Sequence, residues 1–98
     1  MEQAQPQSLV TFERALVLFE ITEADLRGGD SLNRLDHKRR QLLLTWHPSR
    51  YATLTNNPKK YMKMYTQGEA MTKEIQAAYE LLVHRLENHA REEQSNLS

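Results

Sequence analysis

The sequence predicts an all-α fold built around an antiparallel helical hairpin. Apolar residues recur at helical spacing in three segments, and no stretch alternates between apolar and polar residues with period two. Glycine and proline are few, and Gly28-Gly29, Pro48 and Pro58 mark the breaks between the segments. With 98 residues, the chain is long enough for one domain with its own core.

The first helix is expected at about residues 9–20, where four apolar residues follow helical spacing: Leu9, Phe12, Leu16 and Phe19. The residues before it, 1–8, are polar and are expected to form a disordered tail. After it, Thr22-Glu23-Ala24-Asp25 has the pattern of a capping box, which predicts one further helical turn in the linker.

The second helix is expected at about residues 32–46, with Asp30 or Ser31 as its N-cap. Pro48 ends this helix, because the residue before a proline avoids helical geometry. Arg39 lies close to the apolar stripe, so its stem is expected to cover apolar surface while its guanidinium reaches water. The stripe that should face the core consists of Leu32, Leu35, Leu42, Leu43 and Trp46.

The third helix is expected at about residues 58–88, after an exposed loop at 47–57. Asn57-Pro58 is typical of a helix start, with a capping side chain followed by proline at the first position. Gly68 costs about 1 kcal/mol relative to alanine inside a helix, so it either permits close packing or marks a kink.

We assign three methionines to packing, namely Met62, Met64 and Met71. The domain thus spans about 9–89, and residues 90–98 are expected to be a disordered tail.

Composition argues against several classes of function and site. The 13 basic residues equal the 13 acidic residues, so net charge gives no case for a nucleic-acid or membrane partner. There is no cysteine, which excludes disulfides and thiolate metal sites. The first residues do not resemble a signal peptide, and the longest apolar stretch, Ala15 to Phe19, is too short to span a bilayer. We expect a cytoplasmic protein and a monomer.

Two motifs in the second half of the chain resemble the J domain of DnaJ-type co-chaperones. The run KEIQAAYELL at residues 73–82 is similar to the family's Lys-Glu-Ile-x-x-Ala-Tyr-x-x-Leu pattern. His47-Pro48-Ser49 stands where the family has His-Pro-Asp, and it follows apolar residues that match the family's core positions, Leu35, Leu42 and Trp46. The resemblance covers about residues 12–88 and implies a J-like hairpin.

Two shorter matches accompany these motifs. Leu18-Phe19-x-Ile21-Thr22 resembles the end of the family's first helix, with Glu20 where glycine is usual. The aromatic Tyr51 after Arg50 resembles co-chaperones of iron–sulfur cluster assembly. The chain departs from the family in its longer connections before and after His47, and no fourth helix with a basic motif is evident.

The resemblance implies a partner-binding site of seven residues: His37, Lys38, Arg40, His47, Pro48, Ser49 and Arg50. In the family, the His-Pro-Asp loop and the basic face of the second helix bind the ATPase domain of a DnaK-type chaperone and speed ATP hydrolysis. Serine cannot replace a bidentate carboxylate–guanidinium pair. Asp36 and Gln41 also stand where basic residues are common, which weakens electrostatic steering.

These departures favour a non-stimulating adaptor that binds a DnaK-type chaperone or another J protein. A functional co-chaperone that tolerates Ser49 is the first alternative. In a structural reading, His47-Pro48 is only a helix stop and Lys38-Arg39-Arg40 is only a solvated helix face.

Other functions have weaker support. The four histidines lack metal-ligand spacing, and no phosphate loop, nucleophile elbow or paired-carboxylate motif occurs. We therefore expect no enzyme activity, no metal and no cofactor. A small helical DNA-binding domain remains a further alternative because of Lys38-Arg39-Arg40, although the chain lacks a broad basic footprint.

Overall fold

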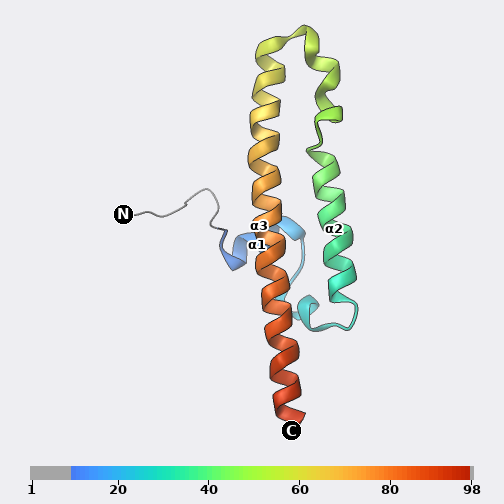
Figure 1. Ribbon diagram of the computed structural model, residues 1–98, viewed down its shortest axis with the longest axis vertical. Coiled ribbons are helices and arrows are strands. Elements are labelled where there is room, and N and C mark those ends of the chain that lie inside the picture. The colour runs from blue at the N-terminus through green and yellow to red at the C-terminus, as the bar shows by residue number, and fades with distance from the viewer. Residues whose placement is uncertain (1–9, 98) are drawn as a thin grey trace, which may run out of the picture.

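The computed structural model describes residues 10–97, and within them all side chains except those of residues 54, 55 and 93–97. This part of the chain is all-helical, as predicted, and contains three α-helices and two 3₁₀ segments (Figure 1). In chain order these are α1 (Phe12–Phe19), η2 (Glu23–Arg27), α2 (Ser31–Thr45), η3 (Pro48–Asn56) and α3 (Pro58–Leu97).

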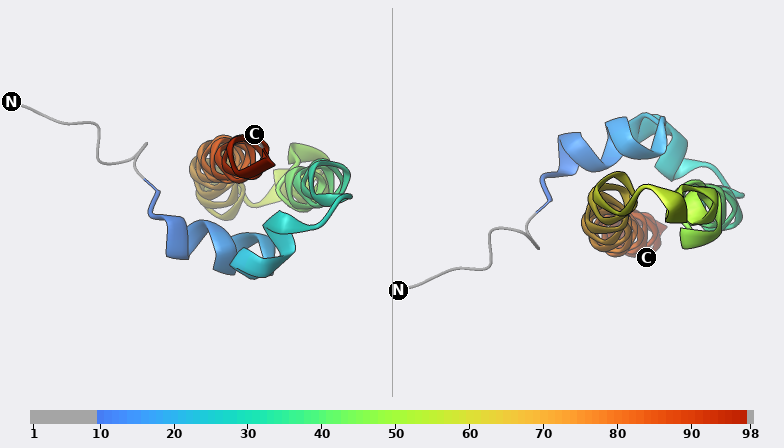
Figure 2. Two further views of the ribbon diagram at one scale, coloured as in Figure 1. Left: turned by 90° about the horizontal axis from the view of Figure 1, so that it is seen from below. Right: turned by 90° about the horizontal axis from the view of Figure 1, so that it is seen from above.

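Two long arms form the body of the molecule. One arm consists of α2 followed by η3, and the first part of α3 runs antiparallel to it from the turn at Asn57 (Figure 1). The second part of α3 continues past the start of α2. Viewed end-on, α1 and η2 lie together on one side of this pair of arms (Figure 2). The short first helix therefore covers one flank of the hairpin.

The core forms where α1, η2, α2 and α3 meet. Phe19, Leu35, Ile75 and Leu82 are its largest fully buried side chains, and each contributes about 1.5–3 kcal/mol through burial. Three of the predicted stripe residues on α2 pack against this cluster while remaining partly exposed: Leu42, Leu43 and Trp46.

The prediction that Leu32 faces the core is wrong, because it is 47% exposed. Ser31 takes the buried position at the start of α2, and successive helical residues point about 100° apart. The Ser31 hydroxyl lies 2.6 Å from the carbonyl oxygens of both Asp25 and Gly28. This contact ties the first turn of α2 to η2.

The helix ends follow local side-chain chemistry. The predicted capping box is present: the Asp25 N–H donates to Thr22 Oγ1, and the Thr22 N–H donates to the Asp25 carboxylate at 2.8 Å. Asp30 is the N-cap residue of α2, but its side chain caps no backbone N–H and accepts a hydrogen bond from Asn33 instead. At the end of α1, Glu20 adopts the left-handed conformation, with φ 57° and ψ 44°.

Several boundaries differ from prediction. The helix α1 begins at Phe12; Leu9 and the tail at 1–8 lie outside the described residues. The prediction that the third helix ends near Asn88 is wrong, because α3 continues to Leu97. No proline or glycine follows Gly68 to stop it, and the polar residues there are mostly good helix formers.

Candidate protein-binding site on the hairpin

The His-Pro-Ser motif lies at a break within one arm and not at the turn of the hairpin. The helix α2 ends at Thr45, and Pro48 begins η3, which continues the arm to Asn56 (Figure 1). The expectation of a loop over 47–57 is therefore wrong for most of its length, although its described side chains are exposed, as predicted, except that of Tyr51. Proline permits this arrangement because it ends one helix and suits the first position of the next.

Hydrogen bonds within the motif fix its shape. The Ser49 N–H donates to His47 Nδ1 at 3.2 Å, and the Ser49 hydroxyl lies 3.0 Å from the same nitrogen. The Arg50 N–H donates to the His47 carbonyl at 2.9 Å. All four side chains from His47 to Arg50 are exposed. The motif thus forms a compact turn whose side chains a partner can reach.

Tyr51 anchors this turn to α3. It is 4% exposed, although its neighbours on both sides are exposed. Its ring meets Tyr61 edge-on with centroids 5.8 Å apart, and its hydroxyl lies over Gly68, where a Cβ would approach to 2.8 Å. Burial raises the pKa of the Tyr51 hydroxyl. Close packing, the first of the two roles predicted for Gly68, is therefore confirmed.

The other three predicted site residues lie nearer the start of α2. Lys38 and His47 are separated by roughly 14 Å along the helix axis, at about 1.5 Å per residue. His37 and Arg40 are exposed, whereas Lys38 is half-buried and pairs with the Glu20 carboxylate at 2.9 Å. The structure thus places His47 to Arg50 in one turn but leaves the basic residues as a separate group, in which Lys38 forms an ion pair with Glu20 at the surface.

A polar contact between α2 and α3 was missed by sequence reasoning. The Tyr79 hydroxyl donates to Asp36 Oδ1 at 2.5 Å, and the Arg39 guanidinium stacks over the Tyr79 ring, with its carbon 4.7 Å from the centroid. Arg39 Nε is buried without a hydrogen-bond partner, so its guanidinium does not simply extend into water as predicted. Spacing within α2 could not reveal this contact, because Tyr79 lies 43 residues away from Asp36.

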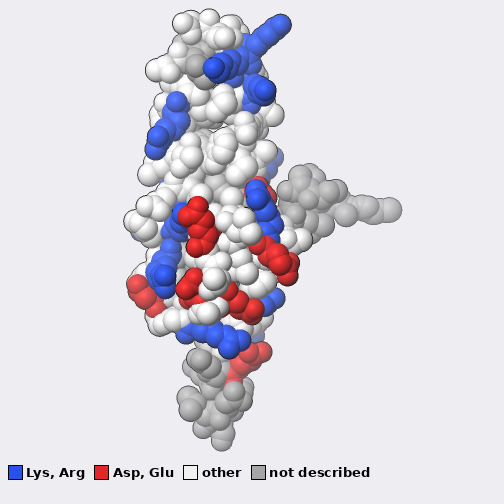
Figure 3. Space-filling model, turned by 180° about the vertical axis from the view of Figure 1, so that it is seen from behind, with Lys and Arg blue, Asp and Glu red and all other residues white. Residues whose placement is uncertain are grey.

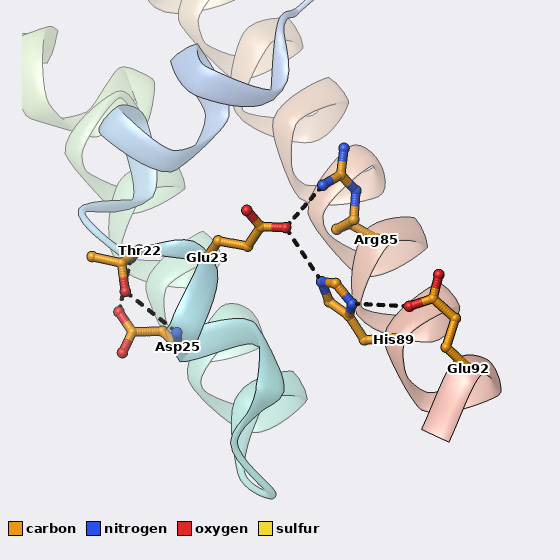
Figure 4. Close-up of polar contacts among 6 residues, drawn as sticks. All are labelled: Thr22, Glu23, Asp25, Arg85, His89 and Glu92. Atoms are coloured by element: carbon orange, nitrogen blue, oxygen red, sulfur yellow. Dashed lines mark hydrogen bonds and ion pairs between the residues drawn. The ribbon is translucent and has the colours of Figure 1, made fainter. Parts of the chain in front are cut away.

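Ion pairs hold α1 and η2 against α3. Arg14 makes two hydrogen bonds to Glu74, at 2.8 and 3.2 Å. Glu23 on η2 reaches Arg85 at 3.1 Å and lies 3.5 Å from His89 Nε2 (Figure 4). The Arg85 guanidinium also covers the Phe12 ring, with its carbon 3.9 Å from the centroid. These contacts hold α1 and η2 against α3, and none of them involves the His47–Arg50 turn.

The chain matches no protein-family model, no curated protein and no solved structure at a significant level. Among the described residues, no helix is both long enough and apolar enough to cross a membrane. The same residues include no group of three or more histidine, aspartate or glutamate side chains placed to hold a metal ion.

Proposed function

We propose that this protein is a J-domain-like interaction module that binds a DnaK-type chaperone or an active J protein of the cytoplasm without stimulating ATP hydrolysis. The observation that carries the proposal is the exposed His47-Pro48-Ser49 turn, held in a defined shape on a helical arm that Tyr51 anchors.

Two features of the scaffold support the resemblance. The run at residues 73–82 supplies three fully buried core residues, Ile75, Ala78 and Leu82. Glu20, which stands where the family usually has glycine, adopts the left-handed conformation that glycine favours. The backbone at Glu20 thus has the conformation for which glycine is suited, even though the side chain here is that of glutamate.

Three other features argue against ATPase stimulation. Ser49 carries no charge, and its hydroxyl contacts His47 within the turn. Lys38 is paired with Glu20, and Asp36 accepts the hydrogen bond of Tyr79. The charge that would contact a chaperone is therefore absent at Ser49, paired at the surface with Glu20 at Lys38, and reversed in sign at Asp36.

Binding and ATPase assays with a DnaK-type chaperone and a full-length J protein test the proposal. We expect the wild-type chain to bind one of the two proteins and to leave the steady-state ATPase rate of the chaperone unchanged. His47→Gln should abolish that binding, whereas Arg91→Gln, an exposed change on the far part of α3, should preserve it. If the chain binds neither the chaperone nor the J protein, the proposed interaction module is excluded.

Ser49→Asp separates the adaptor from the alternative of an active co-chaperone. ATPase stimulation by the wild-type chain, lost in His47→Gln, would contradict the adaptor and favour the co-chaperone. Stimulation by Ser49→Asp alone would show that the scaffold is intact and that only the carboxylate is missing. A charge-assisted hydrogen bond of that kind is worth about 1.5–3 kcal/mol.

A further inference from the structure

The neutral net charge of the chain conceals a strong separation of charge along the hairpin. The tip segment, defined as residues 47–73, contains five of the 13 basic residues and one of the 13 acidic residues, so it carries +4 and the remainder carries −4. Figure 3 shows basic side chains and no acidic ones at this end of the visible face, and a mixture of both signs below it. The five basic residues are Arg50, Lys59, Lys60, Lys63 and Lys73.

One face of α3 within the tip segment combines this charge with apolar surface. A shallow, open groove along this face is lined by residues at helical spacing, with no acidic side chain among them: Lys59, Met62, Lys63, Thr66, Gln67 and Ala70. Met62 is 57% exposed, so its assignment to packing was wrong. Gly68 faces Tyr51 on the inside of the hairpin, and by helical spacing this groove lies on the opposite side of α3.

We propose that this groove, which we call the Lys-Met face, binds an acidic amphipathic helix of a partner protein. The spacing of its lining residues is that of a helix-packing face. Met62 offers a flexible apolar contact of the kind used at adaptable binding surfaces. Lys59 and Lys63 flank it and are complementary to acidic side chains, while the +4 charge of the tip segment steers an acidic partner toward it.

The composition of the Lys-Met face favours a protein helix over nucleic acid or lipid. Only two lysines lie on it, whereas nucleic-acid binding relies on many phosphate contacts along an extended basic surface. Met62 and Ala70 would gain nothing from a phosphate backbone. Binding to a lipid surface needs several large apolar side chains that insert among the acyl chains, whereas a protein helix can pack on Met62 and Ala70 and contact the polar Thr66 and Gln67 as well. This inference is independent of the proposed function, because the face lies away from the His47–Arg50 turn.

The test uses the full chain and a synthetic helical peptide with leucines on one face and glutamates flanking them. We expect salt-sensitive binding by fluorescence anisotropy, and amide shift changes confined to α3 within the tip segment by NMR. Lys59→Glu with Lys63→Glu should weaken binding roughly tenfold or more, and Met62→Ser should weaken it at unchanged salt dependence. The matched control, Arg27→Glu with Arg91→Glu, makes the same change in net charge at exposed positions elsewhere and should bind normally.

Four results would overturn the proposal. One is equal binding of a peptide in which glutamine replaces every glutamate. Another is binding only to duplex DNA or to phosphatidylcholine vesicles containing phosphatidylserine. The third is self-association at low salt without peptide binding, which would identify a second copy as the occupant. The last is no binding of any probe by a chain whose circular dichroism shows it folded. None of these measurements uses a chaperone or a J protein. A negative result would therefore overturn the Lys-Met face proposal without bearing on the proposed function.

Discussion

Gly68 on α3 leaves the space that the Tyr51 hydroxyl occupies: a Cβ added to Gly68 would lie 2.8 Å from the Tyr51 hydroxyl oxygen. The same Cβ would lie 3.2 Å from the carbonyl oxygen of Trp46. The glycine therefore sits where a side chain would separate the arm carrying the His47–Arg50 turn from α3.

Gly68→Ala should destabilise the protein, although alanine is the better helix former. The gain in helix propensity is about 1 kcal/mol, and overpacking against Tyr51 costs about 1–3 kcal/mol. We expect a net loss in the free energy of unfolding, measured by urea denaturation. Adding Tyr51→Phe, which removes the hydroxyl, should recover part of that loss. A more stable Gly68→Ala protein would contradict the contact.

Glu20→Gly should stabilise the protein by roughly 1 kcal/mol, because a side chain in the left-handed conformation is strained and glycine is not. The lost Glu20–Lys38 pair offsets little of this gain, since the Glu20 side chain is 75% exposed and such pairs contribute about 0–1 kcal/mol. Thermal unfolding measures the difference. Glu20→Ala is the control: it removes the same ion pair, keeps the strained Cβ and should not stabilise.

Tyr79→Phe should destabilise the protein by about 1–3 kcal/mol, because Asp36 would lose the hydrogen bond it accepts between the two helices. The same hydrogen bond, together with burial, raises the pKa of Tyr79 above its ordinary value of 10.0. The stability that this shift represents is present below pH 10 and is lost as the pH rises through the higher folded-state pKa. Urea titrations at alkaline pH should show this loss in the wild type and a smaller one in Tyr79→Phe.

Glu74 should make a small contribution to stability that acid removes. Its hydrogen bond with Arg14 lowers the pKa of Glu74 below the ordinary value of 4.5. The contribution is therefore present above pH 4.5 and disappears as the pH falls through the lowered folded-state value. The pair is partly exposed, so the effect should stay below about 1 kcal/mol. In Arg14→Met, the free energy of unfolding should depend less on pH in the acid range; an unchanged dependence would refute the assignment.

Helical spacing and capping chemistry were enough to predict the all-α fold, the second helix to within one residue at each end and the capping box at Thr22 and Asp25. These features depend on neighbours in sequence, which a pattern can represent. The end of α3 was placed too early because the residues after Asn88 carry no apolar stripe, although most of them are good helix formers and no proline or glycine interrupts them. The spacing of apolar residues marks only the part of a helix that packs on a core, so it does not show how far the helix continues beyond that core.

In the candidate site, likewise, the local motif was predicted from sequence, whereas its contacts with distant residues were not. The sequence predicted a binding role for His47, Pro48 and Ser49, and the structure shows that all three are exposed. The sequence did not predict that η3 is helical, because the burial of Tyr51 depends on a space left by Gly68 in another element. It also treated Lys38 as available, whereas Glu20, at the end of α1, pairs with it.

The Tyr79–Asp36 bond also limits how this surface can change over evolution or by design. A basic residue in place of Asp36 would remove the acceptor for the Tyr79 hydroxyl and add a second positive charge near Arg39. Changing Tyr79 first would leave the Asp36 carboxylate without its donor. Either substitution alone therefore leaves one partner of the bond without the other. A more basic second helix would cost this chain a contact that holds α2 to α3.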